Sequence, residues 1–324
     1  MQYGNIPGVS LPVSRIVFGA SLAVMNLRPG MALPPQTTDP MELLDAIYAA
    51  GINTFDSAAI YGEETVGKWV TSRGNREKVV LLTKGCSNNP WRDRVTTYDL
   101  LSDFHDSLAK LQTDYVDIYL LHRDAPDADI PAIMELLGEL HEKGQIRAIG
   151  VSNWHHSRID LANDYARRHG LPQFAVNSPS FGLAACMGDP FKTSITFSGP
   201  ENKDARAWAQ ANQMAIFGYS SLGRGFFSGR YQPSDINRID ELKDHLCIQE
   251  YGFPINFEKL ARAQQLAKEK NATMTQIAFA WVLQQPLNLF AVTSPSSVHH
   301  LNELIAAQDI ILTPQELRWL NVEE

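Results

Sequence analysis

The stretch YVDIYLLHRDAPDADIPAIMELLGELHEKGQIRAIGVSN, residues 115–153, decides the fold of this protein. It opens and closes with short, nearly continuous apolar runs over 115–123 and 146–153, a pattern typical of strands buried on both faces. Between them, 131–144 places apolar residues at the spacing of a helix and ends in Gly144. Strand, helix and strand in this order form a βαβ unit, so the stretch predicts a parallel sheet covered by helices.

The same alternation of apolar runs and helical patterns continues along the rest of the chain. The other predicted strands lie at 15–21, 51–58, 78–85, 173–179, 214–222 and 288–295. Helical patterns are clearest at 40–51, 63–74, 98–111 and 155–170. Eight strand segments suit a closed barrel, and no G-x-G-x-x-G motif follows an early strand as in an open dinucleotide-binding sheet. We therefore expect residues 1–324 to form a single α/β domain, a (β/α)8 TIM barrel.

The composition is that of an ordinary globular protein, and it restricts the partners. Of 324 residues 44% are hydrophobic, and 36 acidic against 28 basic side chains give a net charge of −8. An acidic surface repels phosphate backbones, which disfavours nucleic acid. No apolar run approaches the ~18 residues of a membrane span, and 1–15 lacks the apolar core of a signal peptide. Because Cys86, Cys186 and Cys247 form no disulfide or zinc pattern, we expect a cytoplasmic protein without a metal site.

Polar side chains stand at the ends of the predicted strands, where a barrel gathers its active-site loops. Asp56 ends the second strand with Tyr61 just beyond it, Lys84 ends the third and His122 the fourth. A phenol is a poor acid at neutral pH, but a nearby ammonium lowers its pKa, and a carboxylate keeps that ammonium charged. An imidazole beside the phenol can polarise a carbonyl. These four side chains can therefore assemble a general acid for a developing alkoxide.

Extra length lies in three loops, 21–39, 186–203 and 224–256, which follow the first, sixth and seventh strands. In a barrel these loops frame the same mouth, so we expect them to shape the substrate pocket. Candidate wall residues are Leu22, Met25, Trp91, Trp154 and Phe227.

Four motifs carry a resemblance to a known family: GINTFDSAAIYG (51–62), LLTKG (81–85), LLHRDAP (120–126) and IGVSNW (149–154). In order, spacing and placement at strand ends, they together resemble the aldo-keto reductase family, and the similarity extends over nearly the whole chain. The resemblance implies a (β/α)8 barrel that uses NADPH, or sometimes NADH, to reduce an aldehyde or a ketone.

The resemblance also implies which side chains hold the reacting groups. The family's catalytic tetrad maps onto Asp56, Tyr61, Lys84 and His122, with Tyr61 as the general acid. The residues implied in cofactor binding are Ser152, Asn153, Ser178, Tyr219, Ser220, Leu222, Gly223, Arg224, Ser294, Ser296, His300 and Glu303. In this set the pair 152–153 would hold the carboxamide, Tyr219 would stack on the nicotinamide, and 220–224 would follow the pyrophosphate.

Two segments depart from the family pattern. Ser178 stands where a glutamine commonly gives a second hold on the nicotinamide. In 292–304, Ser294 and Ser296 stand where basic residues commonly bind the adenosine 2′-phosphate, and His300 stands where Arg or Gln is common. Hydroxyl and histidine donors still suit a phosphate, so we expect NADP(H) to be preferred and NAD(H) to be usable.

The sequence thus predicts an NADP-dependent oxidoreductase that reduces a small-molecule aldehyde or ketone to an alcohol by hydride transfer. Two alternatives remain. A nucleotide-sensing binding subunit would keep the cofactor site and show little turnover, which an assay with a panel of aldehydes would reveal. A barrel hydrolase or isomerase would bind no nicotinamide nucleotide, which a titration would reveal.

Overall fold

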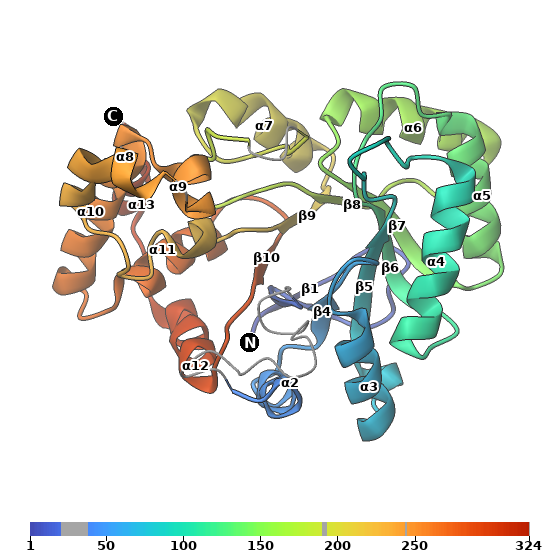
Figure 1. The fold of residues 1–324 in the computed structure, drawn as a ribbon, viewed down its shortest axis with the longest axis horizontal. Helices are drawn as coiled ribbons and strands as arrows, with labels where there is room; N and C mark the ends of the chain where they lie inside the picture. The colour runs from blue at the N-terminus through green and yellow to red at the C-terminus, as the bar shows by residue number, and fades with distance from the viewer. Residues whose placement is uncertain (21–37, 190–192, 244, 324) are drawn as a thin grey trace.

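The structure is a computed structural model that describes residues 1–20, 38–189, 193–243 and 245–323. Eight parallel strands close into a barrel in chain order, with the last strand paired to the first (Figure 1). They are β3 (Ile16–Gly19), β4 (Thr54–Asp56), β5 (Val80–Gly85), β6 (Val116–Leu121), β7 (Ile146–Ser152), β8 (Val176–Ser178), β9 (Ala215–Gly218) and β10 (Leu289–Thr293). The predicted (β/α)8 barrel is confirmed, and each strand lies within a segment expected from its apolar pattern.

Successive residues of a strand face opposite sides of the barrel wall, and both sides are apolar. Leu82 and Leu120 belong to the cluster that fills the barrel interior, while Leu81 and Leu121 pack in the layer between strands and helices. Burial of both faces explains why the strands read as continuous apolar runs rather than as alternating patterns.

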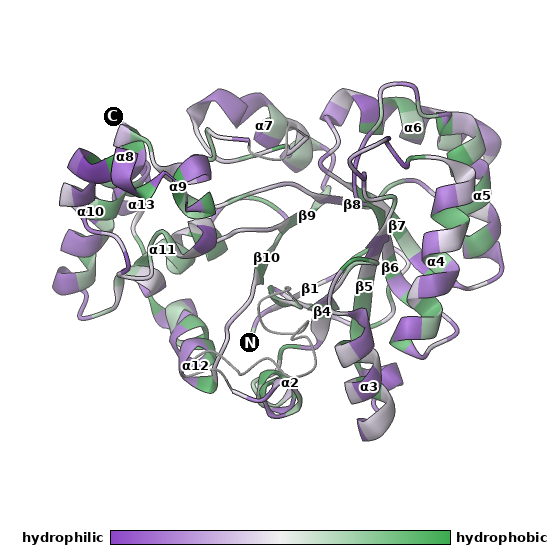
Figure 2. Cartoon of the chain, viewed as in Figure 1, coloured by the Kyte–Doolittle hydropathy of each residue, from purple (hydrophilic) through white to green (hydrophobic). Residues whose placement is uncertain are grey.

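Helices cover the outside of the barrel, and most carry both hydrophilic and hydrophobic residues (Figure 2). Those that follow the first six strands are α2 (Pro40–Ala49), α3 (Glu63–Arg73), α4 (Thr97–Leu111), α5 (Ile130–Glu142), α6 (His156–His169) and α7 (Lys203–Ala211). Later in the chain come α8 (Ile239–Leu242), α9 (Leu246–Tyr251), α10 (Pro254–Glu269), α11 (Met274–Leu283), α12 (Val298–Ala306) and α13 (Pro314–Leu320). Gly74 and Gly170 end α3 and α6 in the left-handed conformation, as their positions in the sequence suggest.

A hairpin that the sequence did not predict closes the N-terminal end of the barrel. It pairs β1 (Tyr3–Gly4) with β2 (Val13–Ser14) in antiparallel fashion. Ile6 and Val13 join the interior cluster. Gly8 has a φ of 88°, and a Cβ there would lie 2.2 Å from the carbonyl oxygen of Arg147, so the turn needs glycine. These two-residue strands are too short to give a period in the sequence.

Described parts of two long loops, 186–203 and 224–256, lie at the opposite end, where they contribute to the cavity wall. The segment 224–256 contains the 3₁₀-helix η4 (Pro233–Arg238) together with α8 and α9. The segment 186–203 includes η2 (Pro200–Asn202), whereas most of 21–39 lies outside the described residues. In the part of the chain that the structure describes, no helix combines the length and apolar character that crossing a bilayer requires.

Candidate active site

Three neighbouring strand ends and one loop bring Asp56, Tyr61, Lys84 and His122 together. Asp56 is the last residue of β4, Lys84 is the second-last residue of β5, and His122 follows β6 directly. The ammonium of Lys84 contacts Asp56 in a buried ion pair, and it also donates to the hydroxyl of Tyr61 at 3.0 Å. The same group donates to the carbonyl oxygen of Ser57 at 2.9 Å, which fixes its direction.

The His122 imidazole completes this cluster. Its ring lies 6.2 Å from that of Tyr61, at an interplanar angle of 76°. Burial lowers the pKa of His122 well below its ordinary value, and the nearby positive charges of Lys84 and Arg123 lower it further. Its Nδ1 atom is buried and has no hydrogen-bond partner among the described residues. The imidazole is therefore neutral at pH 7 and keeps hydrogen-bonding capacity for another group.

The pKa of Tyr61 corrects one sequence expectation. Burial raises the pKa of the phenol above its ordinary value, and the charge of Lys84 opposes this effect without reversing it. Burial alone would lower the pKa of Lys84, but the negative charge of Asp56 raises it overall. Lys84 thus remains a cation, and Tyr61 remains a protonated phenol. The sequence suggested an overall lowering for Tyr61 because the extent of burial could not be read from it.

A cavity of about 830 Å³ opens above this cluster. All four residues line it, and so do most of the residues expected around a cofactor. Those expected residues are Ser152, Asn153, Ser178, Tyr219, Ser220, Leu222, Arg224, Ser294, Ser296, His300 and Glu303. Gly223 does not line the cavity; it is buried beneath it, with the side chain of Phe226 3.1 Å from where a Cβ would lie. Its neighbour Gly225 lines the cavity instead.

Asn153 is the centre of a polar network on the cavity wall. It adopts a φ of 60°, which is uncommon for a residue other than glycine. Its side-chain oxygen accepts from the hydroxyl of Tyr219 at 2.7 Å and from the backbone amide of Ile195 at 3.1 Å. Its amide nitrogen donates to the hydroxyl of Ser152 at 3.0 Å. Burial raises the pKa of Tyr219 to about 12, so this phenol stays neutral.

The serines on the strand ends donate to the barrel itself. Ser152 donates to the carbonyl of Ser178 at 2.8 Å, and Ser178 donates to the carbonyl of Phe217 at 2.9 Å. Ser178 therefore ties β8 to β9. Its side chain is short and already engaged, so it is not equivalent to the longer amide common at this position in the family.

The segment that begins α12 combines hydroxyl and imidazole groups without a cation. Ser294 donates to the carbonyl of Gly19 at 2.7 Å, and the hydroxyl of Ser296 lies 3.1 Å from Nδ1 of His300. Glu303 accepts from the hydroxyl of Thr273 at 2.5 Å. These contacts hold the segment at the cavity edge.

Sequence reasoning missed several lining residues, among them Arg123, Arg230, Glu250 and Thr275. Glu250 forms an ion pair with Arg224, 2.6 Å between Nε and Oε2, so the charge of Arg224 is largely compensated. Arg123 could have been suspected because it follows His122 directly. No periodic pattern indicates the other three, since they come from long loops or a helix start.

Three of the five residues predicted for the substrate wall do not line the cavity, so the prediction is wrong for them. Trp154 is buried and its indole donates to the carbonyl of Arg123 at 2.9 Å, so it packs in the core. Phe227 is fully buried beside Phe226. Trp91 is 87% exposed and does not line the cavity. Leu22 and Met25 lie outside the described residues.

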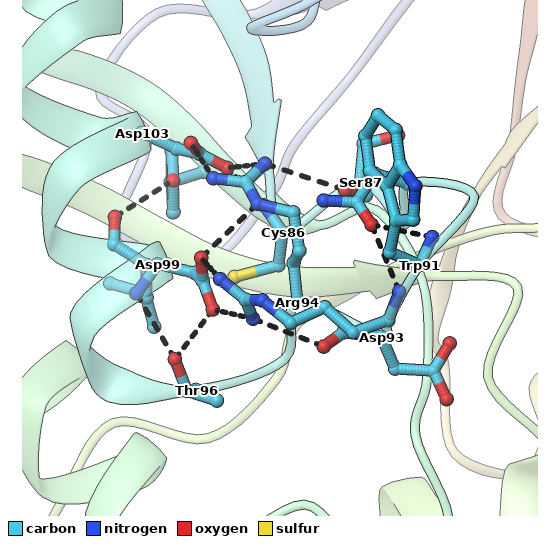
Figure 3. Close-up of polar contacts among 12 residues, drawn as sticks. Cys86, Ser87, Trp91, Asp93, Arg94, Thr96, Asp99 and Asp103 are labelled. Carbon is cyan, nitrogen blue, oxygen red and sulfur yellow. Dashed lines mark hydrogen bonds and ion pairs between the residues drawn. The ribbon is translucent and has the colours of Figure 1, made fainter.

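An ion-pair cluster anchors the loop between β5 and α4, close to Lys84. Figure 3 shows Arg94 between Asp99 and Asp103, and the distances to their oxygens are 3.1 and 2.6 Å. Asp103 also accepts from the backbone amide of Cys86 at 2.8 Å. The cluster thus fixes the residues that directly follow Lys84, including Ser87 on the cavity wall.

We expect this cluster to make stability depend on acid pH. Hydrogen bonds from Arg92 hold the pKa of Asp99 at about 2, with further lowering from Thr96 and against the effect of burial. A carboxyl whose pKa is lower in the folded state stabilises the fold above its unfolded pKa near ~4, and loses this effect as pH falls toward ~2. The loss should be about 1–2 kcal/mol, because a pKa difference of one unit corresponds to roughly 1.4 kcal/mol and Arg92 is partly solvated.

The measurement is urea unfolding of the wild type and of Asp99→Asn at several values between pH 2 and 6. Asp106→Asn, an exposed site on the same helix, serves as the control. The wild type should have a larger free energy of unfolding than Asp99→Asn, and this difference should shrink as pH falls. The corresponding difference between the wild type and Asp106→Asn should stay near zero at every pH. A difference between wild type and Asp99→Asn that is constant with pH would show that the ion pairs do not set the pKa of Asp99.

The described residues contain no group of three or more His, Cys, Asp or Glu side chains arranged to hold a metal ion.

Comparison with known proteins agrees with the barrel fold. The model of the Aldo/keto reductase family matches residues 24–321. The chain therefore belongs to the aldo-keto reductase family, an oxidoreductase family whose members use nicotinamide cofactors.

Named relatives cover most of the chain. The aldo-keto reductase YhdN of Bacillus subtilis (strain 168) is 27% identical over 319 residues, which span 94% of this chain and 88% of that protein. An aryl-alcohol dehydrogenase (NADP+) of Phanerodontia chrysosporium is 28% identical and covers 97% of this chain, with 83% of its own length matched. Aldo-keto reductase yakc (NADP+) of Schizosaccharomyces pombe is 28% identical over 83% of this chain and 78% of its own. Two of these names specify NADP.

Proposed function

We propose that this protein is an NADPH-preferring carbonyl reductase in which Tyr61 protonates the carbonyl oxygen of an aldehyde or ketone. The observation that carries the proposal is the contact of one ammonium, Lys84, with both Asp56 and Tyr61 at the floor of a cavity that His122 also lines. A protonated phenol whose oxygen accepts a hydrogen bond from an ammonium can give up its proton when a neighbouring oxygen becomes basic.

The cavity suits a dinucleotide, which needs polar partners at both of its ends. A single cavity joins the catalytic cluster to Ser296 and His300 at the start of α12. Near the cluster, the buried Nδ1 atom of His122 has no partner among the described residues, and Asn153 presents a polar wall. We infer that Asn153 and Tyr219 hold the nicotinamide end and that 294–303 holds the adenosine end.

The bound nicotinamide cofactor would supply the hydride that reduces the carbonyl carbon. The protein's own part is to hold and protonate the carbonyl oxygen. The neutral imidazole of His122 orients that oxygen beside the hydroxyl of Tyr61. As negative charge develops on the oxygen, Tyr61 transfers its proton, and the adjacent ammonium of Lys84 stabilises the phenolate that remains. Asp56 keeps Lys84 charged throughout.

The proposed function is tested by supplying the protein with NADPH and a panel of aldehydes and ketones, and by following oxidation of the cofactor. Alcohol formation in amounts equal to the cofactor consumed is the expected result. Binding of NADPH without turnover of any carbonyl would indicate a nucleotide-binding subunit, and absence of nucleotide binding would indicate neither function.

We expect NADPH to bind more tightly than NADH. The 2′-phosphate would meet Ser296, His300 and the guanidinium of Arg230, which lines the same cavity. Charge-assisted hydrogen bonds are worth about 1.5–3 kcal/mol each, so the guanidinium of Arg230 would contribute most of the preference. Ser296 and His300 would add further hydrogen bonds to the phosphate, and NADH should remain usable because it makes the other cofactor contacts equally well.

The measurement is the Kd of both cofactors, from fluorescence, in the wild type, His300→Ala and Arg230→Met. His299→Ala is the matched control because its exposed ring neighbours His300 but does not line the cavity. Arg230→Met should reduce the preference for NADPH most, His300→Ala should reduce it less, and His299→Ala should leave it unchanged. A preference for NADPH that is unchanged in all variants would place the phosphate site elsewhere.

A further inference from the structure

Arg123 places a guanidinium beside the reaction centre that the proposed mechanism does not use. It follows His122 directly at the end of β6, and its side chain lines the same cavity as Tyr61 and Asn153. Its charge acts on the titration of three cavity side chains, namely Tyr61, His122 and Tyr219, which shows that it lies within electrostatic reach of each. A permanent positive charge thus stands near the point where a carbonyl would be held.

Two other cations of the cavity wall are already engaged, and Arg230 is assigned above to the cofactor phosphate. Lys84 is paired with Asp56, and Arg224 is paired with Glu250. The carboxylate next in sequence to Arg123, Asp124, forms an ion pair with Arg158 at 2.8 Å and is not available.

Arg123 itself has no ion-pair partner among the carboxylates that the structure describes. Its one described side-chain hydrogen bond runs from Nη1 to the carbonyl of Thr193, at 3.3 Å. A guanidinium has five N–H donors, and one weak contact to a backbone carbonyl leaves most of them for another acceptor. The side chain is neither deeply buried nor fully exposed, so it can reach a bound molecule from the wall.

We propose that Arg123 is a specificity-determining residue that selects carbonyl substrates bearing a carboxylate, so that the preferred substrates are oxo acids. The inference rests on the proposed reductase function and names its substrate class. The planar guanidinium matches a carboxylate in a bidentate pair, which fixes the substrate's orientation as well as its affinity. His122 and Tyr61 hold the carbonyl oxygen while Arg123 holds the acid.

The cavity also offers a surface for the rest of such a substrate. Ile60, on the loop between Asp56 and Tyr61, lines the cavity and is 52% exposed. An apolar body between the carbonyl and the carboxylate can rest on this side chain. An aromatic or aliphatic oxo acid therefore fits the chemistry of the wall better than a neutral polyol or a cationic carbonyl compound.

The test compares an acid with its neutral counterpart in the holoenzyme. The probes are 3- and 4-carboxybenzaldehyde and their methyl esters, which differ in charge but present the same aldehyde. With NADPH, the wild type should have a larger kcat/KM for at least one acid than for its ester. Most of the difference should appear in KM, since a contact made equally in ground state and transition state changes KM alone.

Arg123→Met should lower the acid-to-ester ratio of kcat/KM by about 10- to 100-fold, the range expected for loss of charge-assisted hydrogen bonds. Arg123→Lys should restore part of the ratio, because it returns the charge but not the planar fork. Arg168→Met, on the exposed surface of α6, is the matched control and should leave the ratio unchanged.

The binding of terephthalate to the NADPH complex, followed by quenching of protein fluorescence, tests the anion contact without turnover. Its Kd should rise in Arg123→Met and not in Arg168→Met. Equal handling of acid and ester by the wild type, or an unchanged ratio and unchanged terephthalate Kd in Arg123→Met, would overturn the proposal. If the aldehyde of the methyl esters is reduced as well as that of the acids, the reductase function stands and this substrate class is removed. If terephthalate binds but no aldehyde is turned over, the anion site is supported and the reductase function is contradicted.

Discussion

Replacing Tyr61 with phenylalanine should lower kcat for carbonyl reduction by about 10²- to 10⁴-fold, the range that general acid catalysis contributes. The substitution removes the only phenol within hydrogen-bond distance of Lys84 among the described residues and leaves the ring in place. Burial already favours the protonated phenol, so the native group is ready to donate at neutral pH. No other described side chain combines a transferable proton with this contact.

The measurement is steady-state reduction of one aldehyde, together with the Kd of NADPH for the variant. The Kd should stay close to that of the wild type, because Tyr61 is assigned to the substrate's oxygen rather than to the cofactor. Tyr165→Phe, at a half-buried tyrosine on α6 that does not line the cavity, is the control and should change neither quantity. A kcat for Tyr61→Phe within a few-fold of wild type would remove Tyr61 from its role as the acid.

Replacing Lys84 with methionine should reduce both activity and stability. The change leaves the buried carboxylate of Asp56 without its partner, and breaking such a pair costs about 3–5 kcal/mol. It also removes the cation that opposes the burial effect on Tyr61, so the pKa of the phenol should rise further. In the reverse reaction, alcohol oxidation, which needs the phenolate, the pH–rate profile should therefore shift to higher pH.

A double-substitution cycle separates these effects. If Lys84 and Asp56 act as a pair, the double variant Asp56→Asn, Lys84→Met should lose less free energy of unfolding than the two single variants lose together. Urea unfolding of all four proteins gives the coupling energy, and the pH–rate profile of alcohol oxidation gives the effect on Tyr61. Additive losses and an unshifted profile in Lys84→Met would show that the ammonium couples to neither neighbour.

The barrel strands and the convergence of Asp56, Tyr61, Lys84 and His122 could be predicted from sequence for one physical reason. Both faces of the barrel strands are buried, so β5 and β6 read as largely apolar runs, in which Thr83 and Asp117 are the exceptions. Polar residues at the carboxyl ends of these strands mark the barrel mouth. Lys84 and His122 were found in this way. The register of β4, β5 and β6 then places the carboxyl ends of these three strands side by side, so that their polar residues lie together.

The substrate wall could not be predicted, because it depends on the directions of side chains in irregular loops. Trp154 and Phe227 follow polar motifs in sequence, yet the backbone turns both rings into the core. Arg123 was overlooked for the opposite reason, since a charged residue after a strand is ordinarily a solvated one. The direction in which the pKa of Tyr61 shifts was misjudged, because the sequence shows a neighbouring charge but not the extent of desolvation.

The most direct test of the proposed reaction follows the hydrogen that is transferred. The protein is incubated with NADPH carrying deuterium on both C4 positions and with a panel that includes 4-carboxybenzaldehyde and its methyl ester, and the alcohols are analysed by mass spectrometry and NMR. One deuterium on the carbinol carbon, formed by the wild type and far more slowly by Tyr61→Phe, is the predicted result. Tight binding of the cofactor with no deuterated alcohol from any carbonyl in the panel would contradict assignment of this site as a carbonyl reductase.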